Sequence, residues 1–303
     1  MKVLAIPNLN TVEWKEDMIK QKVAQSGQIL LITLLILAVG TTIALSLLGR
    51  STQDLSISRE IEESSRAFSA AEAGVERALQ SGSGTGGPQT LTPGISYDVL
   101  VSTIGGASGV YTFPKKTPKT ITDTLWLVPH DDDDSDGDGD RTELIETPYY
   151  TSSTIELCWS SETIVPALVV SVIYKEQTDG SYQVAKFTLD KDNSRGNNFI
   201  TVGVPGNHCG QTNVYSRTID FLADLNVTAN ADTLLAMRIR PVYSDTQLSI
   251  DTSGQVLPQQ GKKIESTGTT TTGINRKILV YQQYRSASSI FDAAVFSQNT
   301  FRH

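Results

Sequence analysis

The stretch SGQILLITLLILAVGTTIALSLLGR, residues 26 to 50, continues without a break into STQDLSISREIEESSRAFSAAEAGVERAL, residues 51 to 79. No charged side chain lies between Lys22 and Arg50, and residues 28 to 48 supply about the 20 apolar positions that a membrane-spanning helix needs. A cleaved secretory signal usually has a shorter apolar core, followed by a cleavage site with small residues. Because the helical pattern here continues past the apolar run, we expect this helix to be retained.

The second half of the stretch predicts an amphipathic continuation of the same helix. Leu48, Leu55, Ile61, Phe68 and Val75 recur at intervals of seven, six, seven and seven residues, which predicts one apolar stripe among Ser, Glu, Gln and Arg. Read from residue 28 to residue 80, the helix is roughly 80 Å long. Hydropathy alone also fits a single-pass anchor for an outer domain. A simple tether would more often become rich in Gly, Ser and Pro soon after the membrane, whereas here SGSGTGGP begins only at residue 81.

Two features of this region resemble a known family. Gly27 stands before the uncharged helix, and AFSAAEAGVERAL occupies residues 67 to 79. Both resemble type IV pilins with a class III signal, in particular minor pilins of the PilX kind and the K component of type II secretion; the resemblance covers about residues 22 to 80. It implies that a prepilin peptidase in the bacterial cytoplasmic membrane cuts after Gly27 and methylates Gln28, where phenylalanine is more usual. It also implies a cytoplasmic N-terminus and a helix that packs against other pilins in a filament.

The chain departs from the family pattern at the fifth mature position, where pilins carry a carboxylate and this chain has Ile32. A carboxylate in hydrocarbon is costly unless it is paired, and in pilins its partner is held to be the amino terminus of a neighbouring subunit. A subunit with Ile32 cannot form that pair, so we expect a place at or near a filament tip. The leader, residues 1 to 27, is long for the class. Met18 would start a ten-residue leader whose two lysines suit the cytoplasmic side.

Beyond the helix, the sequence predicts a linker and a β-rich domain. Residues 81 to 94 are expected to be a Gly, Ser and Pro linker, and residues 95 to 303 an extracytoplasmic domain. Period-two alternation and turns rich in Gly, Asn and Asp predict an α+β fold in which the long helix precedes a mostly antiparallel β-sandwich. The expected strands are Tyr97–Ile104, Thr124–Val128, Thr154–Trp159, Ala167–Tyr174, Tyr182–Leu189, Phe199–Val204, Leu234–Ile239 and Lys277–Tyr284.

The two cysteines of the chain, Cys158 and Cys209, fall in this outer domain, where disulfides persist. Cys158 lies in a strand pattern and Cys209 in a Gly-Asn loop. We expect a disulfide that fixes this loop; two unpaired thiols are the alternative. Neither cysteine has the spacing of a metal site.

The acidic run HDDDDSDGDGDRTELIE follows at residues 130 to 146. With Asp132 as the first position it fits the calcium-loop pattern D-x-D-x-D-G-x5-E, in which Gly137 permits the sharp bend. The expected Ca²⁺ ligands are Asp132, Asp134, Asp136, Asp138, Asp140 and Glu143. No paired helices flank the run, so the site would be a loop in a β-domain, and a solvated acidic loop is the alternative. Residues 131 to 146 carry nine acids and one arginine. Because like charges repel, we expect this run to be extended unless it binds cations.

Signals for enzymatic activity are poor, and we expect none. The chain lacks G-x-S-x-G, H-E-x-x-H and P-loop motifs, and its three histidines lie far apart. A basic patch for nucleic acid, from Lys115, Lys116, Lys119, Lys262 and Lys263, is a minority interpretation because the whole chain is acidic, with a net charge of −8. Two function classes remain: a minor pilin or pseudopilin, and a membrane-anchored, calcium-dependent surface binding or adhesion module.

Overall fold

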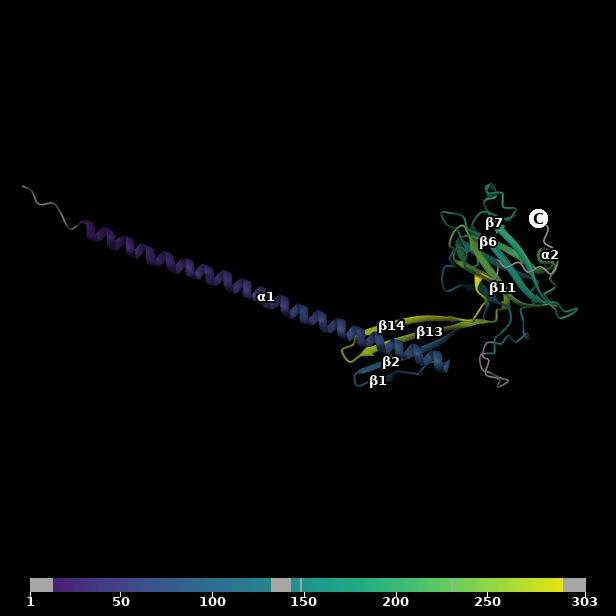
Figure 1. Cartoon of the computed structure of the whole chain (residues 1–303), viewed down its shortest axis with the longest axis horizontal. Helices are drawn as coiled ribbons and strands as arrows, with labels where there is room; N and C mark the ends of the chain where they lie inside the picture. Colours follow the sequence, from purple (N-terminus) through teal and green to yellow (C-terminus); the bar gives the residue numbers. More distant parts are fainter. Residues whose placement is uncertain (1–12, 132–142, 148, 230, 291–303) are drawn as a thin grey trace, which may run out of the picture.

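The structure is a computed structural model that describes residues 13–131, 143–147, 149–229 and 231–290. Side chains are described from residue 27 onward, except residue 52. A long helix projects from a β-rich body, and the body itself has two parts, a sheet beside the end of the helix and a larger group of strands beyond it (Figure 1). The predicted α+β organisation is thereby confirmed.

Helix α1, Glu13–Ser81, is continuous over 69 residues. Its section from Gly27 to Ser81 is long and apolar enough to cross a membrane. The leucine and isoleucine side chains between Ile29 and Leu48 are 49% to 70% exposed, because no other described part of the chain covers them. The first half of this section therefore buries its apolar surface only in something outside the molecule, such as lipid or another subunit.

The C-terminal part of α1 packs on a four-stranded antiparallel sheet, which we call the platform (Figure 1). Its strands are, in spatial order, β1 (Gln89–Thr92), β2 (Ile95–Gly105), β13 (Gln259–Thr270) and β14 (Asn275–Gln283). The helix contacts β2, β13 and β14. The platform thus combines a strand pair that follows α1 directly with a hairpin from the end of the chain.

Small residues bring the helix and the platform close together. The alanines on the packed side of the helix are almost fully buried: Ala67, Ala70, Ala71 and Ala78. A Cβ added at Gly268 would lie 1.9 Å from the carbonyl oxygen of Ala67, and a Cβ at Gly74 would lie 2.3 Å from the Ser266 hydroxyl oxygen. The platform therefore supplies a packing reason for the small residues of the AFSAAEAG block.

Two five-stranded sheets form a β-sandwich beyond the platform. One contains, in spatial order, β3 (Ser108–Thr112), β12 (Leu248–Val256), β5 (Thr154–Ser160), β10 (Gln211–Asp220) and β9 (Gly206–His208). The other contains β4 (Asp123–Trp126), β11 (Thr233–Val242), β6 (Ala167–Lys175), β7 (Tyr182–Asp190) and β8 (Ile200–Thr201). All pairings are antiparallel except that of β7 with β8.

The sandwich has one hydrophobic core between its two sheets. Fully buried side chains include Trp159 from one sheet and Met237 from the other, with Tyr150 and Phe221 closing the core. Phe221 begins the short helix α2 (Phe221–Leu225), whose N-terminus is capped by the Asp220 carboxylate. A 3₁₀ turn, η1 (Asn193–Arg195), lies between β7 and β8. This core is large enough for the sandwich to hold its own shape apart from the platform.

The sandwich is inserted between two neighbouring strands of the platform. The chain leaves the platform at Gly105, the end of β2, and returns at Gln259, the start of β13, and these two residues are paired. At the junction, the Gln260 amide accepts a hydrogen bond from the Trp126 backbone N–H and donates one to the Trp126 carbonyl, both at 2.8 Å. The His130 ring stacks on Tyr284, with 3.8 Å between ring centroids. These contacts join the two parts.

The predicted strands are confirmed in outline, but the domain division differs from the prediction. Strand β1 lies inside the expected linker 81–94, and the expected strand Phe199–Val204 is only the two-residue β8. Six strands were not predicted: β1, β3, β9, β10, β12 and β13. The expected single domain from residue 95 onward is instead part of the platform plus an inserted sandwich.

The predicted apolar stripe on α1 is wrong in one respect. At 100° per residue, the interval of six between Leu55 and Ile61 rotates the side chain by about 120°, so Leu48 and Leu55 lie on a different side of the helix from Ile61 and Phe68. All four are exposed, by 65%, 59%, 65% and 46%, whereas Val75 is half-buried against the platform.

Candidate functional site

An exposed apolar strip along α1 is the first candidate site. It consists of Ile57, Ile61, Phe68 and Leu79, and we call it the outer helix edge. These side chains lie within about 40° of one another around the helix, and they are 55%, 65%, 46% and 45% exposed. Their direction is about a quarter turn away from the alanines that face the platform. Contiguous exposed apolar surface of this kind marks a site of protein or membrane contact.

The platform holds the C-terminal part of the helix, so the outer helix edge has a fixed orientation. Arg276 Nε donates to the Ser64 hydroxyl at 2.7 Å, and the Thr272 hydroxyl donates to Glu63 at 3.1 Å. Arg77 Nη1 donates to the Tyr97 hydroxyl at 3.3 Å. Together with the close approach at Gly268, these bonds prevent free rotation of the helix on the sheet.

The residues of the predicted processing site, Gly27 and Gln28, lie within the continuous helix α1. Gly27 has open space where a Cβ would be, with no atom within 4 Å. Glycine inside an exposed helix costs about 1 kcal/mol relative to alanine. Packing therefore gives no reason for glycine at this position, in contrast to Gly74.

Ile32, which stands where pilins carry a carboxylate, is 49% exposed on the same apolar section. The hydroxyls of nearby threonines are satisfied within the helix: Thr33 donates to the Leu30 carbonyl at 2.9 Å, and Thr41 donates to Ala38 at 2.9 Å. These internal bonds remove the cost of placing the hydroxyls in hydrocarbon.

Most of the predicted calcium loop lies outside the described residues: Asp132, Asp134, Asp136, Asp138 and Asp140. Glu143, the predicted twelfth position, is described and exposed. The base of the loop is closed. The Asp131 N–H donates to the Glu143 carbonyl at 2.9 Å, and the Ile145 N–H donates to the Pro129 carbonyl at 2.9 Å. The two ends of the acidic run are therefore held together.

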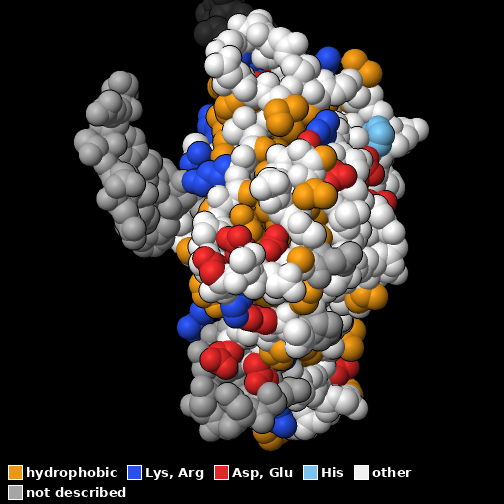
Figure 2. Space-filling model, turned by 90° about the vertical axis from the view of Figure 1, so that its right-hand side faces the viewer, with side chains coloured by type: hydrophobic (Ala, Val, Ile, Leu, Met, Phe, Trp, Pro, Cys, Tyr) orange, Lys and Arg blue, Asp and Glu red, His pale blue; other side chains and the backbone are white. Residues whose placement is uncertain are grey.

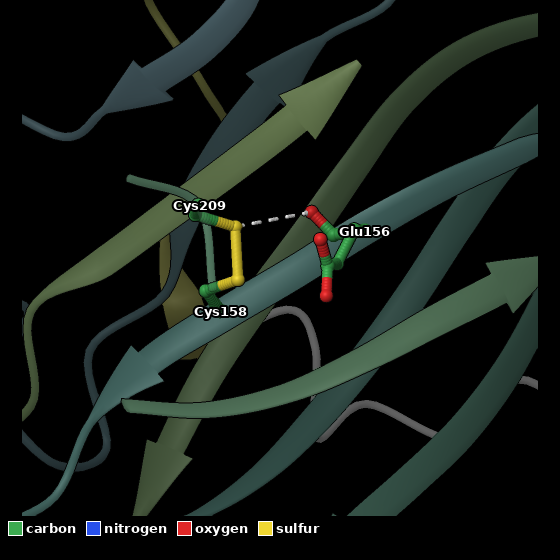
Figure 3. Close-up of side chains that lie close together, drawn as sticks. All are labelled: Glu156, Cys158 and Cys209. Carbon is green, nitrogen blue, oxygen red and sulfur yellow. Dashed lines mark hydrogen bonds between the residues drawn. A yellow bond between two sulfur atoms is a disulfide. The ribbon is translucent and has the colours of Figure 1, made fainter. Parts of the chain in front are cut away.

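The predicted disulfide is confirmed. Cys158 and Cys209 are bonded, with Cα atoms 6.3 Å apart. Cys158 lies on β5 and Cys209 in the tight turn between β9 and β10, where it has φ 47° (Figure 3). Both are buried, together with Val214. The disulfide holds the β9–β10 turn on the outer face of β5, as predicted.

Glu156 lies beside the disulfide, and Figure 3 shows its side chain and the contact of its backbone oxygen with Cys209. Together the three residues place potential metal ligands within 4.8 Å of one another. Because both sulfurs are joined to each other, they do not offer thiolates to a metal. The Glu156 carboxylate contacts His208 Nδ1 at 3.0 Å, which ties the same turn to the sheet a second time.

The lysines considered as a basic patch do not form one cluster. Lys115, Lys116 and Lys119 precede β4 in the sandwich, whereas Lys262 and Lys263 lie on β13 in the platform. Lys116 is paired with Glu162 at 2.5 Å, and Lys263 with Glu265. This separation argues against a nucleic-acid site built from these residues.

Two carboxyl groups in the body have shifted pKa values. Hydrogen bonds from Lys263 and Lys277 lower the pKa of Glu265 on β13 to about 2. At Asp123 on β4, burial raises the pKa, and a hydrogen bond from the Thr117 hydroxyl partly opposes this shift. Asp123 binds the Thr117 hydroxyl and Glu265 binds two lysines, and each contact joins neighbouring segments of the body, so we assign both groups to structure.

One polar centre was missed in the sequence, the segment DKDNSRGN at residues 190 to 197. Asp190 is 2% exposed and accepts two hydrogen bonds from Arg195 Nη1, both at 3.1 Å, and one from Asn197 at 2.7 Å. The guanidinium also lies over the Tyr243 ring, 3.9 Å from its centroid. The alternating polar residues of DKDNSRGN were the available signal. Arg195 therefore balances the charge of the buried Asp190 carboxylate.

Comparison with protein-family models, with curated proteins and with solved structures finds no match to this chain.

Proposed function

We propose that this chain is a minor pilin or pseudopilin. Its partners are other pilins, which contact its N-terminal helix in a type IV pilus or a type II secretion-like filament. The observation that carries the proposal is the division of α1 into two parts. One part is held tightly on the platform by small residues, while the other projects with apolar side chains that no described part of the chain covers. A filament of helices covers such surface, and a membrane covers it before assembly.

Gly27 supports the same proposal from a different direction. Gly27 has no packing role among the described residues, as is also true of Gly40 and Gly49, so its recognition by another protein is argued from its place directly before the uncharged apolar run. The resemblance assigns that role to a prepilin peptidase of the bacterial cytoplasmic membrane, which would leave Gln28 as a methylated terminus. The subunit would be non-enzymatic, and its outer part would lie outside the cytoplasm, where the disulfide persists.

Ile32 and the inserted sandwich favour a place at or near the filament tip. Without a carboxylate at Ile32, the subunit lacks the pair that a neighbouring amino terminus makes in a pilin shaft. The sandwich adds a second body beside the platform (Figure 1), which a repeating shaft would have to accommodate at every subunit. At the tip, the filament would need room for only one sandwich.

Mass spectrometry of the chain from membranes of cells with an active prepilin peptidase tests the proposal. We expect a mature chain that begins at a methylated Gln28, and we expect Gly27→Leu to block cleavage. Gly40→Leu is the matched control, because Gly40 also has open space around it in the same helix and should leave cleavage unchanged. An intact leader in the unsubstituted chain would exclude the pilin proposal.

The alternative function is a membrane-anchored, calcium-dependent surface binding or adhesion module without a filament. The observation that favours it is the closed base of the acidic run, where Asp131 and Glu143 are hydrogen bonded. Limited proteolysis with and without Ca²⁺ tests the calcium part. Protection of the run by Ca²⁺, lost in Asp136→Asn, is the expected result for a calcium loop. Equal cleavage in both conditions would exclude it.

A further inference from the structure

A small hollow lies on the sandwich sheet that contains β4, β11, β6 and β7. It has a volume of about 20 Å³, which is enough for about one water-sized group. Its lining comes from these strands and from the residue before β4: Thr122, Val169, Ser171, Lys186, Arg238 and Arg240. Three of the six residues are cationic and none is acidic. The hollow is therefore positive, in a chain whose net charge is −8.

Strand pairing places these side chains beside one another on the outer face of the sheet. Ser171 on β6 pairs with Arg238 on β11 and with Lys186 on β7. Arg240 follows Arg238 by two residues, so it lies on the same face of its strand. Val170, the neighbour of Ser171, is fully buried in the sandwich core. The cations therefore point away from the core, and the sheet fixes the positions of their backbones before any ligand binds.

Three polar groups of the hollow have no partner in the described part of the chain. Ser171 is only 7% exposed, and its hydroxyl forms no hydrogen bond with a described residue. Neither Lys186 nor Arg240 forms an ion pair with a described residue. Arg238, in contrast, donates to the Ala287 carbonyl at 2.8 Å. A buried donor without an acceptor costs free energy, so the hollow favours a ligand that offers acceptor oxygens.

The acid on β4 does not neutralise the hollow. Asp123 follows Thr122, but it pairs with Ile239 of the core and accepts a hydrogen bond from the Thr117 hydroxyl. On the face of the molecule in Figure 2, lysine and arginine side chains gather at the upper left, and most acidic side chains lie lower. Positive charge that is separated from acids in this way raises the local concentration of anions.

We propose that this hollow binds a doubly charged phosphate group, which is either inorganic phosphate or the terminal phosphate of a monoester. One phosphate oxygen enters the hollow and accepts a hydrogen bond from the Ser171 hydroxyl. The other oxygens accept from Lys186 and Arg240, since ammonium and guanidinium groups are the usual partners of phosphate. A monoester carries a charge of about −1.5 to −2 at neutral pH, which matches two unpaired cations. A carboxylate or a phosphodiester brings only one negative charge.

Apolar surface beside the hollow offers a place for the organic part of a monoester. Val184 precedes Lys186 by two residues on the same face of β7 and is 54% exposed. It pairs with Ile173 on β6, and Val169 lines the hollow itself. The site lies on the sandwich, apart from α1, so it does not depend on filament assembly.

Isothermal titration calorimetry of the full chain in detergent, in a buffer without phosphate or sulfate, tests the proposal. The probes are phenyl phosphate and inorganic phosphate, compared with dimethyl phosphate and acetate. We expect at least one of the two doubly charged probes to bind about tenfold or more tighter than both singly charged ones, and to weaken as salt screens the charges. Tighter binding of phenyl phosphate would assign a monoester as the ligand, and equal or tighter binding of inorganic phosphate would assign free phosphate.

Lys186→Gln tests the location, because Lys186 is exposed and its loss should not disturb the fold. Lys115→Gln is the matched control: it removes the same charge from an exposed lysine between β3 and β4 that does not line the hollow. We expect Lys186→Gln and Ser171→Ala each to weaken binding about fivefold or more, and Lys115→Gln to leave it unchanged. Thermal unfolding of each variant checks that the fold is retained.

Three results would each overturn the proposal. The first is equal binding by Lys186→Gln and Lys115→Gln. The second is binding of acetate or dimethyl phosphate as tight as that of the doubly charged probes. The third is no binding of either doubly charged probe at about 10 mM, a concentration that would saturate even a weak site.

Discussion

Glycine serves different purposes at different positions of this chain. At Gly268 and Gly74 the backbone of the helix and the side chains of the platform leave no space for a Cβ. At Gly27 the space is open, as it is at Gly40 and Gly49, so packing within the described part of the chain does not account for the glycine. Sequence alone does not separate the two cases, because both kinds of glycine stand in regular secondary structure.

Gly268→Ala should therefore be strongly destabilising. The new Cβ would meet the Ala67 carbonyl oxygen and the Ala71 nitrogen at 1.9 Å and 2.7 Å, so the helix must move away from β13. We expect a loss of about 3 kcal/mol in the free energy of unfolding, at the upper end for overpacking. Denaturant unfolding of the full chain in detergent measures it. Gly203→Ala is the control, because Gly203 has open space, and an equal effect of both variants would contradict the packing argument.

The pair Asp190 and Arg195 gives a second prediction. Arg195→Met leaves the carboxylate of Asp190 buried without its cation, which costs about 3 to 5 kcal/mol. The double variant Asp190→Asn with Arg195→Met should recover part of that loss. Arg66→Met is the matched control, because Arg66 pairs with Glu62 at 2.5 Å and both side chains are more than half exposed, and such pairs contribute about 1 kcal/mol or less. Thermal unfolding of all three variants distinguishes the cases, and equal losses from the two arginine substitutions would contradict this assignment.

Glu265 makes stability depend on pH. Its pKa is lowered in the folded chain to about 2, from an ordinary value near 4.5, by Lys263 and Lys277. A lowered pKa contributes stability above the ordinary value, and this contribution is lost as the pH falls from about 4.5 toward 2. We expect Glu265→Gln to lower the melting temperature at pH 6 and to have less effect near pH 2. Thermal scans across this range measure the difference.

Asp123 should change the stability with pH in the opposite direction from Glu265, so it serves as an internal control. Burial raises its pKa, so its contribution is present below the ordinary value of 3.8 and is lost as the pH rises through the folded value. Asp123→Asn should remove that loss, so its melting temperature relative to the unsubstituted chain should rise between pH 3 and pH 6. The same pH trend for both variants would contradict the two assignments.

At the scale of elements, the sequence predicted strands rich in apolar and β-branched residues and missed several strands rich in polar residues or glycine. Strand β6, ALVVSVIYK, is apolar and β-branched and was predicted almost to its ends. Strand β13, QQGKKIESTGTT, was missed because its glycines and polar residues are explained only by the helix that lies on it. Strand β10, QTNVYSRTID, lies between β5 and β9 in its sheet and yet has few apolar residues. In both strands, tertiary contacts replace the hydrophobic pattern.

The features of the candidate sites likewise divide into those that the sequence predicts and those that it does not. The apolar length of α1 and the pairing of the two cysteines could be predicted, because each depends on local composition or on a single pair. An apolar groove of about 440 Å³ at the junction of sandwich and platform could not be predicted, because Gly106, Tyr149 and Val256, which line it, are far apart in the sequence. The buried centre at Asp190 was missed because the positive charge that pairs with it comes from a side chain of the same segment, Arg195, and not from a bound ion.

The disulfide gives a prediction for the β9–β10 element. Cys158 and Cys209 are separated by 51 positions, and closing a loop of that length stabilises the folded chain by about 4 kcal/mol in the chain-entropy description. Cys158→Ser with Cys209→Ser should therefore lower the denaturant midpoint, and a reducing agent should do the same to the unsubstituted chain but not to the double variant. Unchanged unfolding under reducing conditions would show that the disulfide carries no stability.

At the scale of the whole molecule, the insertion separates the sandwich from the platform that holds the helix. The platform holds α1, and the sandwich lies beyond one end of its two inner strands, β2 and β13, which lead into it side by side (Figure 1). Among the described residues, the sandwich is joined to the rest of the chain by these connections, by the contacts of Gln260 and His130, and by a hydrogen bond from Arg238 Nη2 to the Ala287 carbonyl at 2.8 Å, after the end of β14. The sandwich could therefore change in sequence without altering the surface of α1, which, if the pilin proposal is correct, would let the sandwich vary while the helix still packs with other pilins.

The last prediction follows from the pairing of Gly105 with Gln259. Because paired residues on antiparallel strands lie about 5 Å apart, a short turn such as Asn-Gly can replace residues 106–258 and join β2 to β13 as a hairpin. The platform core of α1, Tyr97, Val99 and Ile264 does not include the sandwich, so we expect the shortened chain to keep α1 protected from proteolysis on the platform.

The excised piece, residues 107–257, keeps its own core and its disulfide and should unfold in a single cooperative transition. If the pilin proposal is correct, the shortened chain is also cleaved at Gly27. Digestion of α1 in the shortened chain at the same rate as in unfolded protein would mean that the two bodies fold as one unit, because the helix would then depend on a domain that it does not touch.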